Sequence, residues 1–113
     1  MLNDYGFLTV RVQTGGAYPV EGALVRIRGA EEENAEIVFS LLTDRDGITD
    51  KIRLPAPSPG LSMYPEAKEL PYSIYDLEID ADGYIPKRIY GLTVFPGISA
   101  IQIVDLIPEN INN

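Results

Sequence analysis

Apolar and polar side chains alternate along several short stretches of this chain. Between residues 7 and 13, Leu8, Val10 and Val12 are separated by polar side chains. Successive side chains of a β-strand point to opposite faces, so this period of two predicts a strand with one buried face. No stretch shows a sustained apolar period of 3.6 residues, and proline and glycine recur too often for long helices. The chain is therefore predicted to be all-β.

Seven such stretches are separated by turn signals, which include Asp-Gly at 46–47 and 82–83 and Pro-Gly at 96–97. The predicted strands cover residues 7–13, 22–28, 37–43, 48–54, 73–80, 87–95 and 99–107. Short strands at this spacing are typical of a β-sandwich, and 113 residues is the size of one domain. We predict a seven-stranded antiparallel Greek-key β-sandwich over residues 1–108, followed by a polar tail at 109–113.

The alternation also predicts which side chains are buried. The inward set is Leu8, Val10, Val12, Ala23, Val25, Ile27, Phe39, Ile52, Leu54, Tyr75, Leu77, Ile79 and Val94. Both phases of the last stretch are apolar, with Ile101 and Ile103 on one face and Val104 and Leu106 on the other. The buried face is left open there, and burial of both faces is one alternative. Gly47 and Gly83 are predicted to adopt positive φ in their turns.

A proline-rich segment, residues 55–71, separates the fourth and fifth predicted strands. Prolines at this density are excluded from a strand ladder because each lacks a backbone donor. The segment is also too apolar for a flexible linker, so it is predicted to pack as an ordered crossover between the sheets. Long loops of this kind often carry function. The candidate binding residues are Leu61, Met63, Tyr64 and Tyr72.

Composition narrows the chemistry that is available. The chain has no cysteine and no histidine, which removes disulfides, thiolate metal sites and the commonest general base. A net charge of −8 disfavours nucleic acid and anionic membranes as partners. No apolar run is long enough for a transmembrane helix, and no secretory signal is recognised at the N-terminus. We expect no cofactor and no membrane insertion, and the compartment is left open.

One group of carboxylates invites a metal hypothesis. Asp44, Asp46 and Asp50 surround a predicted Gly turn, and calcium prefers oxygen ligands. An EF-hand would need a glutamate at residue 55, where the chain has Pro55. Asp-x-Asp-Gly is also ordinary turn chemistry, in which aspartates accept hydrogen bonds from local amides. The turn is the preferred interpretation, with calcium as the alternative.

Several motifs together resemble a known family. Residues 6–10 (GFLTV), 19–25 (PVEGALV), 43–49 (TDRDGIT) and 75–84 (YDLEIDADGY) resemble the transthyretin-like (prealbumin-like) sandwich modules of the carboxypeptidase regulatory-domain type. Residues 54–57 (LPAP), 71–75 (PYSIY), 94–99 (VFPGIS) and 104–108 (VDLIP) are similar to modules of clostridial spore and cell-wall proteins. The resemblance implies an accessory module without catalytic residues, associated with the spore or cell envelope.

These observations lead to two functional hypotheses and exclude some enzymes. Transthyretin-like hydrolases of urate products depend on histidine, which is absent here. Lysine–asparagine crosslinking in related adhesins needs a first-strand lysine, where this chain has Arg11. We therefore expect a non-catalytic structural or assembly module of a bacterial surface, spore or phage-like structure, with a protein partner or self-association. The alternative is a carbohydrate-binding module for peptidoglycan or another glycan.

Overall fold

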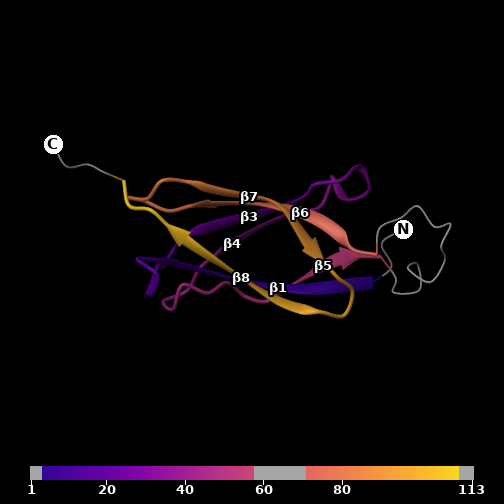
Figure 1. The fold of residues 1–113 in the computed structure, drawn as a ribbon, viewed down its shortest axis with the longest axis horizontal. Coiled ribbons are helices and arrows are strands. Elements are labelled where there is room, and N and C mark those ends of the chain that lie inside the picture. The colour runs from indigo at the N-terminus through magenta and orange to yellow at the C-terminus, as the bar shows by residue number, and fades with distance from the viewer. Residues whose placement is uncertain (1–3, 58–70, 110–113) are drawn as a thin grey trace.

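The computed structural model describes residues 4–57 and 71–109 and contains eight β-strands and one short 3₁₀ helix in that part of the chain. The strands form two layers that face each other along the length of the molecule (Figure 1). The elements are β1 (Asp4–Thr14), β2 (Tyr18–Pro19), β3 (Leu24–Gly29), η1 (Glu32–Asn34), β4 (Val38–Leu42), β5 (Ile52–Ala56), β6 (Ser73–Asp80), β7 (Lys87–Val94) and β8 (Ser99–Leu106). The predicted all-β sandwich is confirmed.

β1 is the central strand of the first sheet. β5 pairs with residues 4–8 of β1, and β2 pairs with residues 13–14 of β1, both antiparallel. β8 pairs with residues 7–14 of β1 and is parallel to it. Because the β8 pairing overlaps both of the others, β8 must lie on the opposite side of β1 from β5 and β2. The second sheet has the order β4-β3-β6-β7 and is antiparallel throughout.

The observed strands differ from the expected ones in three details. A two-residue strand, β2, was not predicted, and β5 begins at Ile52 rather than at residue 48. Before β5, Ile48 forms only an isolated bridge with Arg11. Five of the six strand pairs described are antiparallel, and the exception joins the first strand to the last. Side-chain alternation carries no information about the direction of a partner strand, which explains this difference.

The core agrees closely with the predicted inward set. Eleven of its thirteen side chains are buried, and Phe39 and Ile52 are half-buried and pack against the same cluster. In β8, Val104 and Leu106 are buried, whereas Ile101 and Ile103 are exposed. The structure thus decides the open question about the last strand, and the alternative in which both faces are buried is wrong. Only one apolar face of β8 contributes to the core.

Buried hydroxyl groups join the turn after β4 to its neighbours. Thr43 Oγ1 donates to Val20 O at 2.6 Å and accepts from the N–H of Ala23 at 2.8 Å. Thr49 Oγ1 accepts from the N–H of Val10 at 3.0 Å. A buried polar group is costly unless it is hydrogen-bonded, and these groups are satisfied. The two threonines therefore hold the 43–49 turn against β1 and against the loop between β2 and β3.

Candidate functional site

The predicted crossover site falls largely outside the residues that the structure describes. Leu61, Met63 and Tyr64 lie in the undescribed segment 58–70. Tyr72 is described and half-buried, and its ring centroid lies 5.3 Å from that of Phe95 with the planes tilted by 59°. This is a normal aromatic pair geometry. The Tyr72 ring is therefore already in contact with another ring, and the predicted role of the crossover stays a prediction.

The aspartate group behaves as a turn. Asp44 Oδ1 accepts from the N–H of Asp46 at 2.8 Å and from the N–H of Ile48 at 3.0 Å. The backbone N–H of Gly47 donates to Asp44 O at 2.9 Å and closes the turn. Across residues 4–57 and 71–109, no three acidic side chains come together in a group suited to hold a metal ion. These local hydrogen bonds agree with the turn interpretation. Calcium binding by Asp44, Asp46 and Asp50 stays an untested alternative.

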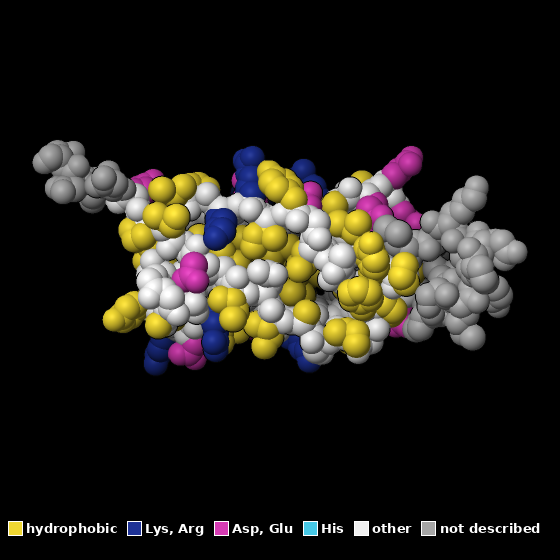
Figure 2. Space-filling model, viewed as in Figure 1, with side chains coloured by type: hydrophobic (Ala, Val, Ile, Leu, Met, Phe, Trp, Pro, Cys, Tyr) yellow, Lys and Arg dark blue, Asp and Glu magenta, His cyan; other side chains and the backbone are white. Residues whose placement is uncertain are grey.

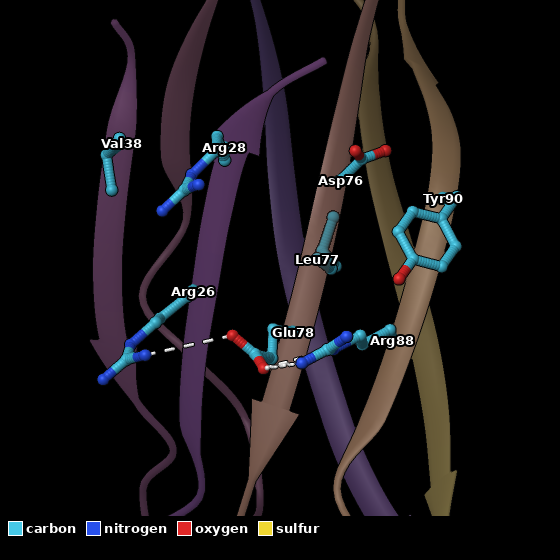
Figure 3. A pocket seen from close by; sticks show the side chains of 8 residues that line it. All are labelled: Arg26, Arg28, Val38, Asp76, Leu77, Glu78, Arg88 and Tyr90. Atoms are coloured by element: carbon cyan, nitrogen blue, oxygen red, sulfur yellow. Dashed lines mark hydrogen bonds and ion pairs between the residues drawn. The ribbon is translucent and has the colours of Figure 1, made fainter. Parts of the chain in front are cut away.

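The outer face of the second sheet carries a shallow groove of about 320 Å³ that sequence reasoning did not identify (Figure 3). Its lining residues come from all four strands: Val38 of β4, Arg26 and Arg28 of β3, Asp76, Leu77 and Glu78 of β6, and Arg88 and Tyr90 of β7. The alternation in β3 did indicate that both arginines face outward. The sequence did not show which strands would lie beside them.

Two cross-strand rows form the floor of this groove. In one row, Arg26 lies opposite Glu78, which lies opposite Arg88. Glu78 is 3.2 Å from Arg88 Nη2 and 3.9 Å from Arg26 Nη1, so the pair with Arg88 is the closer one. Figure 3 shows the carboxylate between the two guanidinium groups. Hydrogen bonding to Tyr90, and then to Glu78, raises the pKa of Arg88 above its ordinary value.

The second row runs from Arg28 on β3 to Asp76 on β6 and continues into a β-bulge on β7. The register between β6 and β7 shifts after Tyr75, so that Tyr90 and Gly91 together lie opposite Asp76. Gly91 has φ +77°, and its N–H donates to Asp76 Oδ1 at 3.0 Å. A bulge bends its strand and changes the direction of a side chain. Here it leaves the Tyr90 side chain 69% exposed at the edge of the groove.

A different surface lies along β8. In the space-filling view, hydrophobic side chains are spread across the face along which β8 runs (Figure 2). Ile101 and Ile103 are 70% and 51% exposed and point away from the core. No described strand pairs with the side of β8 that faces away from β1. We call this side, over Ser99–Leu106, the β8 edge. The described residues include no helix with the length and apolar character to cross a membrane.

Comparison with solved structures identifies the same sandwich in larger proteins. The Bacillus anthracis TIE protein matches 91% of this chain at 17% identity with a TM-score of 0.60, and the match covers 16% of that protein. Hydroxyquinol 1,2-dioxygenase from Pseudomonas putida DLL-E4 matches 94% at 15% identity with a TM-score of 0.64, covering 57% of that chain. Catechol 1,2-dioxygenase from Acinetobacter sp. ADP1 matches 98% at 11% identity with a TM-score of 0.60, also covering 57%.

No family model matches the sequence, and no curated protein matches it. At these identities the structural match shows the fold alone: the chain shares a two-layer β-sandwich with parts of those proteins. It spans less than two thirds of each of them. The predicted resemblance is therefore confirmed at the level of the sandwich, and its clostridial spore and cell-wall component stays a proposal.

Proposed function

We propose that this chain is a non-catalytic assembly module that associates with a second copy of itself through the β8 edge. The observation that carries the proposal is an eight-residue edge strand that presents Ile101 and Ile103 on its outward face. Exposed edges of this kind are templates for pairing with another chain. The setting in a bacterial surface, spore or phage-like structure rests on the resemblance described above.

The backbone geometry of β8 supports pairing at this edge. Ile98 O accepts from the N–H of Phe7, and Leu106 O accepts from Thr14 Oγ1, so carbonyls at even positions point toward β1. Backbone direction alternates along a strand, so the odd positions point outward. Gln102 Nε2 donates to Ile103 O, and Lys87 Nζ donates to Asp105 O at 3.3 Å. Both hydrogen bonds are exposed to solvent, and we expect a partner strand to replace them with backbone hydrogen bonds to Ile103 O and Asp105 O.

The other edges are better protected against pairing. β5 contains Pro55, and β7 carries Lys87, Arg88 and the bulge at Gly91. Charge, proline and bulges are the usual features that block edge pairing. β4 has no charged residue, but it is only five residues long. β8 is the longest edge strand without proline, bulge or basic residue in the described sheets.

A second copy fits this edge better than a charged partner. Residues 99–104 carry no charge, although the chain as a whole has a net charge of −8. Two β8 strands paired antiparallel about a twofold axis would place isoleucines side by side, and each cross-strand pair contributes about 0.2–1 kcal/mol. The first sheets of the two copies would then form one continuous sheet.

Replacing Ile101 by lysine should weaken the dimer at least tenfold, because it places a charge at each side of the paired edge. Light scattering after size exclusion, over a range of concentrations, measures the effect. Leu42→Lys is the matched control, because Leu42 is 65% exposed on β4 and receives the same new charge. A wild-type protein that stays monomeric at high concentration contradicts the proposal. If Leu42→Lys weakens the dimer and Ile101→Lys does not, the interface lies on β4 and the proposal is also wrong.

Salt should strengthen this association. Each copy has a net charge of −8, so two copies repel each other at low ionic strength. The Debye length falls from about 10 Å at 0.1 M to about 3 Å at 1 M salt, which screens the repulsion and leaves the backbone pairing intact. We expect the dissociation constant to fall about threefold across that range. Weaker association at high salt would indicate an interface made of ion pairs instead.

The carbohydrate-binding alternative was expected at the crossover. Tyr64 lies outside the described residues, and Tyr72 contacts Phe95, so the structure offers no support for a stacking platform built from these two rings. The hypothesis that the chain is not an enzyme rests on its composition. The dioxygenases are larger proteins that match this chain in fold alone, so their activities are not assigned to it. Both points stay proposals.

A further inference from the structure

The groove on the outer face of the second sheet offers a separate binding site, on the opposite sheet from β8. Its volume of about 320 Å³ lies at the lower end of the range of small-ligand sites, about 300–1,000 Å³. Sites of this kind combine an apolar contact surface with a few polar groups that fix orientation. The groove supplies both, since Val38 and Tyr90 line it together with three arginines and two acidic residues.

Among the described residues, the Arg28 guanidinium is the cation of this groove that forms no ion pair or hydrogen bond with a neighbour. Asp76 lies opposite Arg28 in the strand register, but one of its oxygens accepts from the N–H of Gly91. Figure 3 shows the Arg28 side chain directed away from Asp76 and toward β4. A guanidinium group binds a carboxylate through two parallel hydrogen bonds, so Arg28 is suited to an anionic group.

The acidic residues restrict what kind of anion can bind. Asp76 and Glu78 lie in the same groove, and the whole chain has a net charge of −8. A polyphosphate, a nucleic acid or a strongly acidic peptide would place several negative charges beside these carboxylates and be repelled. A ligand with one negative charge among many hydroxyl groups avoids this conflict, because Asp76 and Glu78 accept hydrogen bonds from hydroxyls.

The exposed ring of Tyr90 adds an apolar surface at the edge of the groove. The bulge at Gly91 presents the ring to solvent, and its hydroxyl is turned toward Arg88 (Figure 3). An aromatic ring with one polar end provides a large contact area together with a hydrogen-bonding group. The C–H face of a sugar ring matches such a surface. We propose that this groove binds a short saccharide that carries a single carboxylate.

A nuclear magnetic resonance titration of the full chain tests this proposal. The probe is the disaccharide of N-acetylglucosamine and N-acetylmuramic acid, which has one carboxylate, and its neutral counterpart is chitobiose in its N,N′-diacetylated form. We expect millimolar binding of the charged disaccharide, at least tenfold tighter than that of chitobiose, with backbone amide shifts concentrated at Arg28, Asp76 and Gly91. Equal affinity for the two sugars, shifts at other residues, or no binding would overturn the proposal.

Variants separate this site from a general charge effect. Arg28→Gln should remove the preference for the charged sugar, and Tyr90→Ala should weaken both sugars by a similar factor. Arg11→Gln is the matched control, since it removes the same charge from an exposed position on β1 in the other sheet. An equal loss with Arg11→Gln contradicts the assignment, and so does tighter binding of a tetraglutamate peptide. Because the site lies away from the β8 edge, Ile101→Lys should leave sugar binding unchanged, whatever its effect on assembly.

Discussion

Replacing Gly47 by alanine should lower the free energy of unfolding by about 3 kcal/mol or more. Gly47 is buried in the turn after β4 and has φ +76°, a conformation that is unfavourable for an L-residue with a side chain. A Cβ at this position would also collide with Val12 O and lie 3.1 Å from the amide nitrogen of Val20. Both neighbours are backbone atoms, which rotamer changes cannot move away.

The same contact carries hydrogen bonds that the collision would disturb. The N–H of Val12 donates to Gly47 O at 2.7 Å, and the N–H of Val20 donates to Val12 O at 2.9 Å. A displaced turn therefore weakens the centre of β1 as well as the turn itself. Because both the conformation and the contact are affected, the expected loss exceeds the value of about 1 kcal/mol that is typical of a point substitution.

Urea unfolding monitored by circular dichroism measures this loss. Gly83→Ala is the matched control, because Gly83 has φ +85° and a Cβ there would have no atom within 4 Å. The control should show only the conformational penalty, about 1 kcal/mol. The difference between the two variants then gives the cost of the collision with β1. Equal losses would show that the close approach of the turn to β1 adds nothing to stability.

Gly47 illustrates how far the sequence could predict this fold. The positive φ of Gly47 and Gly83 followed from Asp-Gly turn chemistry, and the structure confirms both. The collision with β1 could not be predicted, because it depends on a strand more than thirty residues away that packs against the turn. Local periodicity identifies strands and their buried faces. Contacts between strands are set by tertiary packing, which a single sequence does not show.

In the candidate sites too, local periodicity predicted the direction of side chains, whereas their neighbours depend on tertiary packing. The outward direction of Arg26 and Arg28 was predicted from alternation in β3, but their neighbours Glu78 and Arg88 depend on the register of β6 and β7. The bulge that exposes Tyr90 adds a residue to β7 without a distinctive turn motif. For β8, composition showed two competing apolar faces. Only the arrangement of the second sheet determined which of them is buried.

Stability should fall by about 2 kcal/mol between pH 10 and pH 12 because of one buried tyrosine. Burial raises the pKa of Tyr75 from 10.0 to about 12, and the negative charge of Glu31 adds to the rise, while a hydrogen bond with Asn34 acts in the opposite direction. The Tyr75 hydroxyl donates to Pro55 O at 2.7 Å, a bond that only the protonated form can make. Tyr75 thus links β6 in one sheet to β5 in the other.

The sign of the effect follows from proton binding. Below pH 10, Tyr75 is protonated in both the folded and the unfolded state, and its stabilising contribution is complete. Between pH 10 and pH 12, the unfolded chain releases this proton while the folded chain keeps it, so the free energy of unfolding falls as the pH rises. Above pH 12 both states are ionised, and the contribution is lost. A shift of two pKa units corresponds to about 2.7 kcal/mol.

Tyr75→Phe isolates this contribution in urea unfolding curves measured at intervals between pH 8 and pH 12. The variant should lose about 1 kcal/mol at pH 8, because Pro55 O is left without its donor, and should then fall less steeply with pH than the wild type. Tyr18→Phe is the matched control, since Tyr18 is 70% exposed and the same oxygen is removed. Its curve should keep the wild-type slope. If Tyr75→Phe also kept that slope, the pH dependence would have to arise from other groups, and the link between the sheets would not depend on a protonated Tyr75.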